Sequence, residues 1–435
     1  MKLPGYVLQC LNALEDAGYP CYAVGGCVRD AVLGRTPHDF DLCTGATPAQ
    51  IKGVFRDHKL VLAGEKHGTV GVITEEGVVE ITTFRTEGAY LDNRHPDSVT
   101  FVRDIREDLA RRDFTVNAMA WSPIRGFADP FGGREDLKNK ILRAVGDPET
   151  RFREDSLRIL RGMRFAVRFG LEPEAATMAA MENLAPLMEN LARERVFDEL
   201  CKLLPGVTAR DLIRFAPILT AVIPELKEAV GFQQHNHHHK YDIFTHTALV
   251  TEGVPGDLAL RWAALLHDVG KVSTYFMGED GEGHFYGHAK VSAEMADSIL
   301  RRLKAPNVLR ERVVRLIELH MTQLVPEIRP VRRWISRLGW DTMEALLTLQ
   351  EADVIGTGVP HDLSTYARIQ ELMAQIRGEN ACLSVKDLAV NGKDLMELGL
   401  TGPRVGKTLE RLLAMVMDEK LPNEKTALLK AAQQQ

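Results

Sequence analysis

The stretch GGCVRDAVLGRTPHDFDL, residues 25–42, places two glycines and an Arg-Asp pair ahead of the sequence Asp39-Phe40-Asp41. Alternate residues of a strand point to the same face, so a strand here would present Asp39 and Asp41 together and turn Phe40 into the core. Two like charges this close repel each other unless a divalent cation lies between them, and carboxylate oxygens are typical ligands of Mg²⁺. A solvated strand edge is the alternative interpretation.

The residues before this pair are typical of a strand, a tight turn and a short helix. Gly25 and Gly26 follow the apolar run CYAV, and glycines let the backbone approach a phosphate group closely. Arg29 adds a guanidinium fork that suits a phosphate. The turn therefore predicts a phosphate site, although an ordinary strand-to-helix turn can use the same residues.

Length and composition indicate a globular protein with several domains. The chain has 435 residues, of which 45% are hydrophobic and 26% are charged. No apolar run reaches the length of a membrane span, and Glu15 and Asp16 lie where a signal peptide would be apolar. These features predict a cytoplasmic protein without a membrane partner. The 6 cysteines form no C-x-x-C pair, which indicates reduced and mostly buried thiols.

Basic residues are concentrated in one segment, although the net charge of the chain is −6. The segment TRFREDSLRILRGMRFAVRFG, residues 150–170, contains six arginines and only two acidic residues. Asp147-Pro148 predicts the start of a helix and Gly170 its end. On one such helix Asp155, Arg158 and the two following arginines would be neighbours along a slanted ribbon. An acceptor beside a donor can read the Watson–Crick edge of a base.

The pattern of elements predicts an α+β fold. Short β-rich runs occur from about residue 22 to residue 142, and Glu75-Glu76-Gly77 is typical of a hairpin turn between two alternating strands. Helical patterns dominate the rest of the chain, for example in the segments 186–204, 258–270 and 405–419.

Six motifs together resemble one family: GGCVRD, DFDLCTGATP, RRDFTVNAMA, DPFGGREDL, EDSLRILRGMRF and ARERVFDEL. They occur in the order found in the bacterial tRNA nucleotidyltransferase and poly(A) polymerase family, the class II CCA-adding enzymes, over about the first 205 residues. The resemblance implies a small mixed-sheet head of the DNA polymerase β type, followed by a mostly helical neck, body and tail. The predicted domains are 1–145 (nucleotidyltransferase head), 146–210 (neck that recognises the base), 211–360 (body with an HD domain) and 361–435 (tail that binds tRNA).

The resemblance also implies roles for individual residues. Asp39 and Asp41 match the aspartates that hold Mg²⁺ while an RNA 3′-hydroxyl attacks the α-phosphorus of the nucleotide. Glu80 matches a third carboxylate of such heads, and a strand-edge glutamate is the alternative. Arg164 rotates towards an apolar side and ranks below its neighbours. The residues matched to nucleotide binding are Gly26, Arg29, Arg112, Asp113, Asn117, Asp155, Arg158, Arg161 and Arg164.

A second set of ligand-type residues lies in the later half of the chain. The order of His246, His267-Asp268 and Asp353 resembles the HD phosphohydrolase superfamily, and His288 is a further candidate ligand. Imidazole and carboxylate together suit a transition metal such as Ni²⁺, Mn²⁺ or Co²⁺. A degenerate domain that serves as a tRNA-binding scaffold is the alternative. The loop histidines 235 and 237–239 receive no role.

These patterns predict an enzyme that adds C, C and A to tRNA from CTP and ATP, with a second HD phosphohydrolase activity. Poly(A) addition, CC-only addition and A-only addition stay open, and the segment TEGAYLDNRHPDSVT, residues 86–100, is a candidate determinant of that choice. An HD phosphohydrolase with the head as an RNA-binding module is the alternative from a different class. The sequence leaves the oligomeric state open.

Overall fold

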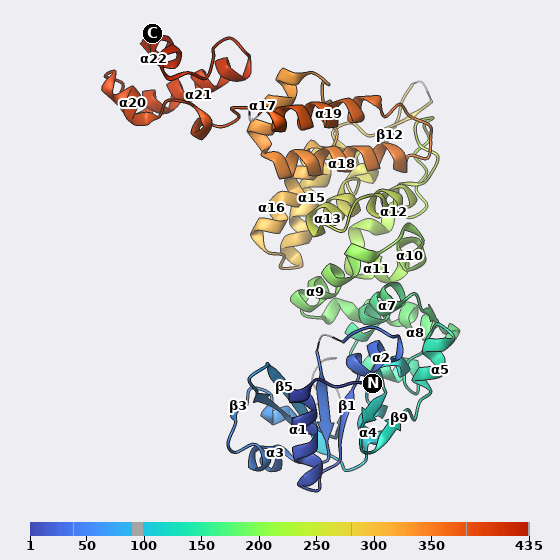
Figure 1. The fold of residues 1–435 in the computed structure, drawn as a ribbon. Helices are drawn as coiled ribbons and strands as arrows, with labels where there is room; N and C mark the ends of the chain where they lie inside the picture. Colours follow the sequence, from blue (N-terminus) through green and yellow to red (C-terminus); the bar gives the residue numbers. More distant parts are fainter. Residues whose placement is uncertain (38, 89–98, 280, 380, 434–435) are drawn as a thin grey trace. The chain divides into compact units, whose positions relative to one another are not determined.

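The structure, a computed structural model, describes residues 1–435 except 38, 89–98, 280, 380 and 434–435 (Figure 1). The chain divides into two compact units, Met1–Lys227 and Glu228–Gln435. The four domains expected from the sequence are a finer division than these two units, and their boundaries stay a prediction.

The first unit is built on a seven-stranded sheet in the order β3-β4-β5-β2-β1-β8-β9. Strands β2 and β5 are parallel and the other neighbours are antiparallel, so the sheet is mixed, as predicted. Buried Val24, Cys43 and Phe84 belong to a core cluster on this sheet. The strands are β1 (Cys21–Val24), β2 (Asp41–Thr44), β3 (Lys59–Val61), β4 (Thr69–Ile73), β5 (Val78–Thr83), β8 (Ala120–Ser122) and β9 (Gly126–Ala128).

The predicted hairpin turn joins β4 to β5. The hydroxyl of Thr74 donates to the carbonyl oxygen of Gly77 at 2.7 Å and accepts from the Gly77 amide at 3.1 Å. These two bonds close the turn around Glu75 and Glu76 and set the antiparallel register of the strands. The prediction of a hairpin here is confirmed.

Helices make up most of the rest of the first unit (Figure 1). Two further strand pairs are short: antiparallel β6 (Arg85–Glu87) with β7 (Val99–Phe101), and parallel β10 (Ile141–Leu142) with β11 (Glu172–Pro173). The helices are α1 (Gly5–Asp16), α2 (Gly26–Val32), α3 (Pro48–Val54), α4 (Ile105–Ala110), α5 (Gly133–Lys138), α6 (Pro148–Glu154), α7 (Leu157–Phe169), α8 (Ala175–Leu184), α9 (Arg193–Leu203), α10 (Ala209–Arg214) and α11 (Ala216–Val222).

The basic segment forms two helices, so the prediction of one continuous helix is wrong. Its ends are as predicted, because Asp147 caps α6 by accepting from the Thr150 amide and Gly170 ends α7 at φ +62°. The helix is interrupted at Asp155, whose backbone is extended and whose carboxylate accepts from the Leu157 amide at 3.1 Å. An aspartate that caps its own chain in this way competes with the helical hydrogen bonds.

The second unit is helical, apart from a short hairpin of β12 (Phe276–Met277) and β13 (Gly283–His284). One core cluster joins α17, α18 and α19 through residues such as Ile335, Leu347 and Ile369, and a separate cluster joins α20, α21 and α22. The helices are α12 (Ile243–Gly253), α13 (Leu258–Leu266), α14 (Lys271–Thr274), α15 (His288–Arg302), α16 (Asn307–Leu319), α17 (Ile328–Leu338), α18 (Trp340–Gly356), α19 (Ser364–Gly378), α20 (Gly392–Glu397), α21 (Pro403–Met417) and α22 (Lys425–Gln433).

Three other expectations concern the cysteines, membrane-spanning helices and the choice of nucleotide. The cysteines are free and four of them are buried, as predicted. Among the described helices, none has the length and apolar character needed to cross a membrane. The candidate determinant of nucleotide choice falls largely on residues 89–98, which lie outside the described residues.

Candidate active sites

Carboxylates gather at the start of β2 in the first unit. Asp41 opens this strand, and Glu80 is its register partner on the parallel strand β5. Asp39 lies before the strand, and Phe40 is only half-buried. The prediction that Asp39 and Asp41 lie on one strand is therefore wrong. The predicted Glu80 nevertheless falls beside Asp41.

The surroundings of Asp41 make its charge unfavourable. The pKa of Asp41 is raised. The main cause is that neighbouring residues displace water from its carboxylate, and the negative charges of Glu80 and Asp39 add to the effect. Arg112 acts in the opposite direction. A bound cation would relieve this repulsion, so the carboxylates fit a Mg²⁺ site.

The glycine turn brings two arginines next to this strand. Gly25 joins β1 to α2 with a φ of +71°, and a Cβ at this position would lie 2.8 Å from Nη1 of Arg112. Arg29 is buried, and its Nη1 donates to Oδ1 of Asn117 at 2.6 Å. The guanidinium of Arg29 also lies 4.2 Å from the ring centroid of Phe169. Three of the predicted nucleotide-binding side chains are therefore held close to the turn.

Asp113 ties the head to α7. Both Nε and Nη2 of Arg161 donate to Oδ2 of Asp113, at 2.8 and 2.6 Å, and Asn117 donates to Oδ1 at 3.0 Å. Burial raises the pKa of Asp113, but the charge of Arg161 and the hydrogen bonds outweigh it and lower the pKa to about 2. Asp113 is therefore ionised at neutral pH and fixes Arg161 in place.

Arg158 is held by three acceptors. Its Nη1 donates to Oε2 of Glu154 at 2.6 Å and to the carbonyl oxygen of Arg151 at 3.0 Å. Its Nη2 donates to the carbonyl oxygen of Arg111 at 3.0 Å. The guanidinium is therefore oriented before any ligand arrives, which lowers the entropic cost of binding one.

Asp155 has a partner that the sequence reasoning missed. Nη2 of Arg195, on α9, donates to its Oδ2 at 3.0 Å. Arg195 belongs to the motif ARERVFDEL, so the motif contained a signal for this residue. The pair joins the helix break to α9.

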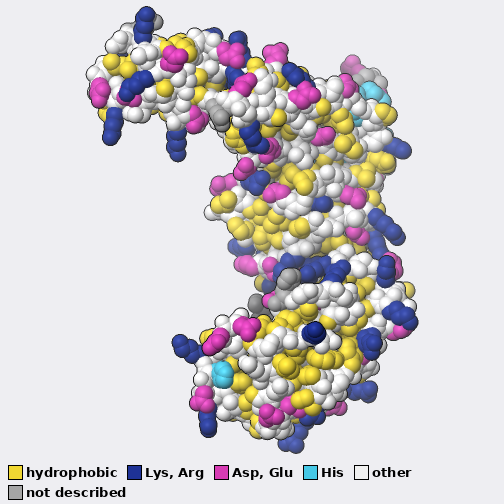
Figure 2. Space-filling view, in the orientation of Figure 1, with side chains coloured by type: hydrophobic (Ala, Val, Ile, Leu, Met, Phe, Trp, Pro, Cys, Tyr) yellow, Lys and Arg dark blue, Asp and Glu magenta, His cyan; other side chains and the backbone are white. Residues whose placement is uncertain are grey.

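These residues line a cavity of about 400 Å³ within the first unit. Figure 2 shows Lys and Arg side chains gathered at the level of α7 and α9. Six arginines line the cavity, so it suits a ligand with several negative charges. The lining residues are Gly25, Gly26, Arg29, Asp41, Arg111, Arg112, Asp113, Asn117, Asp155, Leu157, Arg158, Arg161, Phe165 and Arg195.

Arg164 is the predicted nucleotide contact that points elsewhere. It does not line this cavity. Its Nε donates to Oε2 of Glu199 at 2.6 Å, and both side chains are buried. The rotation of α7 turns Arg164 towards α9, as its position on the helix had indicated. A buried ion pair of this kind belongs to the packing of the unit.

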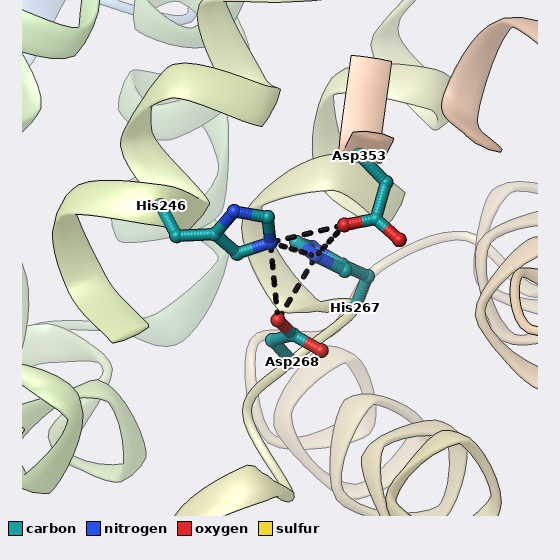
Figure 3. A group of neighbouring side chains, drawn as sticks. All are labelled: His246, His267, Asp268 and Asp353. Atoms are coloured by element: carbon teal, nitrogen blue, oxygen red, sulfur yellow. Dashed lines mark hydrogen bonds and ion pairs between the residues drawn. The ribbon is translucent and has the colours of Figure 1, made fainter. Parts of the chain in front are cut away.

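The second unit gathers the predicted HD residues at one point (Figure 3). Nε2 of His246 lies 3.3 Å from Oδ2 of Asp268 and 3.0 Å from Oδ1 of Asp353. Nε2 of His267 lies 3.2 and 3.5 Å from the same two atoms. The four side chains come from α12, the end of α13 and α18, and all but Asp353 are fully buried. This geometry can hold a metal ion.

A second ligand group shares Asp268 with the first. It consists of Asp268, the predicted His288 and His320, whose role the sequence reasoning missed. His320 follows the last residue of α16 and is buried. In the sequence His320 ends the segment RERVVRLIELH, residues 310–320, whose helical pattern gives no feature of a metal-binding motif.

Backbone carbonyl groups orient three of the rings. Nδ1 of His267 lies 2.8 Å from the carbonyl oxygen of Ala264, and Nδ1 of His320 lies 2.6 Å from that of Ile317. His288 is held in the same way, at 2.8 Å from the carbonyl oxygen of Phe285. When such a ring is neutral and its proton is on Nδ1, Nε2 has a free electron pair, which is the arrangement that metal-binding histidines use.

Burial and the neighbouring carboxylates shift the pKa values of the histidines in this cluster. Burial lowers the pKa of His267, but Asp268 and Asp353 outweigh it and raise the pKa to about 10. Burial instead lowers the pKa of His320 to about 4. His239, a loop histidine given no role, packs edge-on to the ring of His246 and also has a pKa lowered by burial, to about 3.

A cavity of about 530 Å³ adjoins the cluster within the second unit. His320 and Asp353 form part of its wall, and Leu324, Gln350 and Tyr366 are among its other lining residues. No Lys or Arg is among the described residues that line it. The cavity therefore suits an uncharged organic group whose anionic end lies at the cluster.

Three family models for tRNA nucleotidyltransferases and poly(A) polymerases match successive parts of the chain. The family described as "Poly A polymerase head domain" matches residues 21–143, and "Probable RNA and SrmB- binding site of polymerase A" matches 170–229. A family for the second domain of tRNA nucleotidyltransferases matches residues 284–432. The matches follow one another along most of the chain.

Relatives that match nearly the whole chain are CCA-adding enzymes. The chain is 36% identical over 430 residues to the CCA-adding enzyme of Levilactobacillus brevis, covering 97% of the chain and 95% of that relative. It is 33% identical over 424 residues to that of Bacillus velezensis, covering 96% and 95%. The crystal structure of the Bacillus stearothermophilus CCA-adding enzyme with CTP matches with a TM-score of 0.72 and 30% identity, over 99% of the chain and 97% of that structure. The predicted polymerase β-type head with a helical body is confirmed.

Proposed function

The chain belongs to the family of bacterial CCA-adding enzymes, and we propose that it adds C, C and A to the 3′ end of tRNA from CTP and ATP, without a nucleic-acid template. One observation carries the proposal for this chain: a single arginine-lined cavity has Asp41, Asp155 and Arg158 among its lining residues. Relatives solved with CTP, ATP and tRNA support the choice of substrates.

We assign Asp39, Asp41 and Glu80 as the residues that hold Mg²⁺. The raised pKa of Asp41 beside two further carboxylates supports a site built for a cation. The bound ion would neutralise charge on the triphosphate and favour the ionised form of the attacking hydroxyl. The RNA 3′-oxygen bonds to the α-phosphorus, the bond from that phosphorus to the bridging oxygen breaks, and pyrophosphate leaves.

The arginines bind and orient the nucleotide. Arg29 and Arg112 lie at the glycine turn, close to Asp41, and are assigned to the triphosphate. Arg161 is fixed by ionised Asp113, so it presents its charge in one position. Because these groups are placed before the substrate binds, little reorganisation is needed during the reaction.

Asp155 and Arg158 are assigned to base selection. Asp155 offers acceptors and Arg158 offers donors, and together they complement the amino group and ring nitrogen of cytosine and adenine. The hydrogen bonds of Arg158 to Glu154 and two carbonyl groups hold its guanidinium. Uracil and guanine present a different pattern of donors and acceptors and would leave polar groups unpaired.

The test uses three tRNA substrates, ending before CCA, after C and after CC, with CTP and ATP given separately and together. Full CCA addition predicts two C residues from CTP alone on the first substrate and one A on the third. Repeated A addition would indicate a poly(A) polymerase, and arrest after CC or action on the CC end alone would indicate one of the two partial activities. No incorporation on any substrate would leave the head as an RNA-binding module and contradict the proposal.

We propose a second activity in the second unit, the metal-dependent hydrolysis of a phosphoester at an RNA 3′ end. The substrates that fit are a terminal phosphate and a 2′,3′-cyclic phosphate, whose removal frees the hydroxyl that the head extends. His246, His267, Asp268 and Asp353 would hold a transition metal such as Ni²⁺, Mn²⁺ or Co²⁺, which would polarise the phosphoester. The adjoining cavity, with Tyr366 in its wall, has room for the terminal nucleoside.

The second activity is tested by phosphate release and ring opening of 2′,3′-cyclic nucleotides with Ni²⁺, Mn²⁺, Co²⁺ or Mg²⁺. Wild type and Asp39→Ala should act equally, and Asp268→Ala should be inactive, because the two sites lie in separate units. Absence of hydrolysis with every metal would instead favour the scaffold role. Activity that survives in Asp268→Ala but not in Asp39→Ala would place the reaction in the head.

A further inference from the structure

Three arginines surround the ring of Phe169, the last residue of α7. The guanidinium carbons of Arg29, Arg35 and Arg168 lie 4.2, 5.2 and 5.4 Å from the centroid of this ring. Phe169 is half-buried, whereas Arg35 and Arg168 are exposed. A cation over the face of a phenyl ring is attracted by the ring's quadrupole, so Phe169 helps to hold three like charges together.

The ends of two helices bring Arg35 and Arg168 to this ring. The helix α2 ends in a Schellman motif, in which Gly34 has a φ of +69° and the amide of Arg35 donates to the carbonyl oxygen of Asp30 at 2.8 Å. Arg35 therefore directly follows the turn that ends α2. Arg168 lies in the last turn of α7, which ends at Gly170.

The positive charges around Phe169 are only partly compensated. Arg29 pairs with Asp30, whose Oδ1 lies 2.8 Å from its Nη2. Neither Arg35 nor Arg168 forms an ion pair or a side-chain hydrogen bond with the part of the chain that the structure describes. Burial lowers the pKa of Arg29, Asp30 opposes this effect, and the charge of Arg168 adds to it. An anionic ligand would relieve the repulsion between these like charges.

The ring of Phe169 lies next to the arginine-lined cavity. Phe165, which lines the cavity, lies one turn earlier on α7, and the centroids of the two rings are 6.0 Å apart. Arg29 is also a lining residue, and its guanidinium carbon lies over both rings. Arg29 therefore connects the cavity to the exposed Arg35 and Arg168.

Phe169 lies at the opposite end of α7 from the residues assigned to the base. Arg158 is in the first turn of this helix and Phe169 is its last residue, so about 16 Å of helix axis separates them. The base and the terminal phosphate are the two ends of a nucleoside triphosphate. A nucleotide whose base reaches Arg158 and whose triphosphate lies beside Arg29 would therefore have its terminal phosphate on the Phe169 side of the cavity.

We propose that Arg35 and Arg168 bind the terminal phosphates of the nucleotide and receive the pyrophosphate that leaves, and that Phe169 positions both arginines beside Arg29. The inference deepens the proposed nucleotide addition, on which it rests. A guanidinium can donate two parallel hydrogen bonds to a phosphate group. Because Arg35 and Arg168 are exposed, pyrophosphate bound to them would lie next to solvent.

The first experiment measures the affinity of the full chain for CTP, pyrophosphate and CMP. It uses calorimetric titration with Mg²⁺ at fixed ionic strength and without tRNA. Arg35→Ala and Arg168→Ala should each weaken the binding of CTP and of pyrophosphate about 10-fold and leave the binding of CMP unchanged. Arg35→Lys keeps the charge and should lose less.

The chain offers a matched control in Arg134, a second exposed arginine that lies over a half-buried phenylalanine. Its guanidinium carbon lies 4.9 Å from the ring centroid of Phe127, and neither residue lines the arginine-lined cavity. Arg134→Ala should therefore bind CTP and pyrophosphate as wild type does.

The second experiment tests the positioning role of Phe169. Phe169→Leu removes the ring and should weaken the binding of CTP and pyrophosphate about 3- to 10-fold, whereas Phe169→Tyr keeps the ring and should bind as wild type does. Adding Arg35→Ala to Phe169→Leu should cost less affinity than Arg35→Ala costs in wild type, because the ring acts through this arginine. Thermal unfolding checks that each variant is folded.

The outcomes separate this inference from the proposed nucleotide addition. Unchanged affinity for CTP and pyrophosphate in Arg35→Ala and Arg168→Ala would overturn the inference, even if wild type completes CCA ends. Equal weakening of CMP, or a greater need for tRNA with unchanged affinity for pyrophosphate, would also overturn it, and the latter would assign the arginines to the RNA strand. Weaker binding of CTP and pyrophosphate by variants of a chain that adds no nucleotide would support the site and contradict the proposed activity.

Discussion

Asp41 and Glu80 are register partners on the adjacent parallel strands β2 and β5. Partners in register have side chains on the same face of a sheet, so the two carboxylates lie side by side although 38 residues of sequence separate them. This relationship turns an Asp-x-Asp pattern into a group of three carboxylates with Asp39. It is the structural reason to expect that Glu80 takes part in binding Mg²⁺.

Glu80→Gln should therefore weaken the response of nucleotide addition to Mg²⁺. The substitution keeps the size of the side chain but removes a negative charge, and loss of such a group typically costs about 10- to 100-fold in metal affinity or activity. The measurement is the Mg²⁺ concentration needed for half-maximal incorporation of CMP. Glu76→Gln, in the exposed hairpin turn of the same strand pair, is the matched control and should behave as wild type. Equal Mg²⁺ dependence of the two variants would exclude Glu80 as a ligand.

Arg158→Ala should relax the choice of base, because it removes the donors assigned to cytosine and adenine. We expect incorporation of UMP and GMP to rise relative to CMP and AMP by about 10-fold or more. Arg164→Ala, six residues further along the same basic segment, is the matched control. It breaks the buried pair with Glu199 and should lower stability by about 3 kcal/mol while leaving the relative use of the four nucleotides unchanged. A uniform loss of rate with all four nucleotides in Arg158→Ala would indicate a structural role instead.

Asp113 should stabilise the first unit in a pH-dependent way. Its pKa is about 2 in the folded chain against an ordinary 3.8, so the folded state favours the ionised form. The stabilisation is present above pH 3.8 and is lost as the pH falls towards 2. Asp113→Asn should therefore lower the free energy of unfolding by about 2 kcal/mol at pH 7, and by less at pH 3. Urea denaturation at both values checks this, and a difference that does not shrink at pH 3 would refute the linkage.

Metal binding in the second unit should weaken as the pH falls. The pKa of His246 is raised and that of His267 is raised to about 10, so His267 carries a second proton at neutral pH when no ion is bound. An ion must displace this proton, which lowers the apparent affinity about tenfold per pH unit below that pKa. Calorimetric titration with Mn²⁺ between pH 6 and pH 8, in Asp39→Asn/Asp41→Asn, measures the slope. A pH-independent affinity would mean that these imidazoles are not ligands.

The sequence could predict those parts of the sites that depend on local pattern. The turn at Gly25, the capping by Asp147 and the hairpin at Glu76 each follow from a few adjacent residues, and the structure has all three. The motifs also placed Asp41 and the neck arginines near one another, because the family fixes their arrangement. The His and Asp residues of the second unit followed from their order along the chain.

The errors concern interactions between distant segments. The break at Asp155 depends on a carboxylate that caps its own chain and pairs with Arg195, which is 40 residues away. The role of His320 depends on α16 ending beside Asp268. Helical periodicity describes one segment at a time, so it could not have predicted either contact.

Asp39 and Asp41 are the proposed centre of nucleotide addition. The deciding measurement is incorporation of radiolabelled CTP and ATP into tRNA that lacks CCA, in wild type, Asp39→Ala and Asp41→Ala, with thermal unfolding as a check that each variant is folded. We predict complete CCA ends with wild type and at least about a 100-fold loss in either folded variant. A folded Asp39→Ala or Asp41→Ala chain that keeps more than about one hundredth of wild-type incorporation would contradict the account.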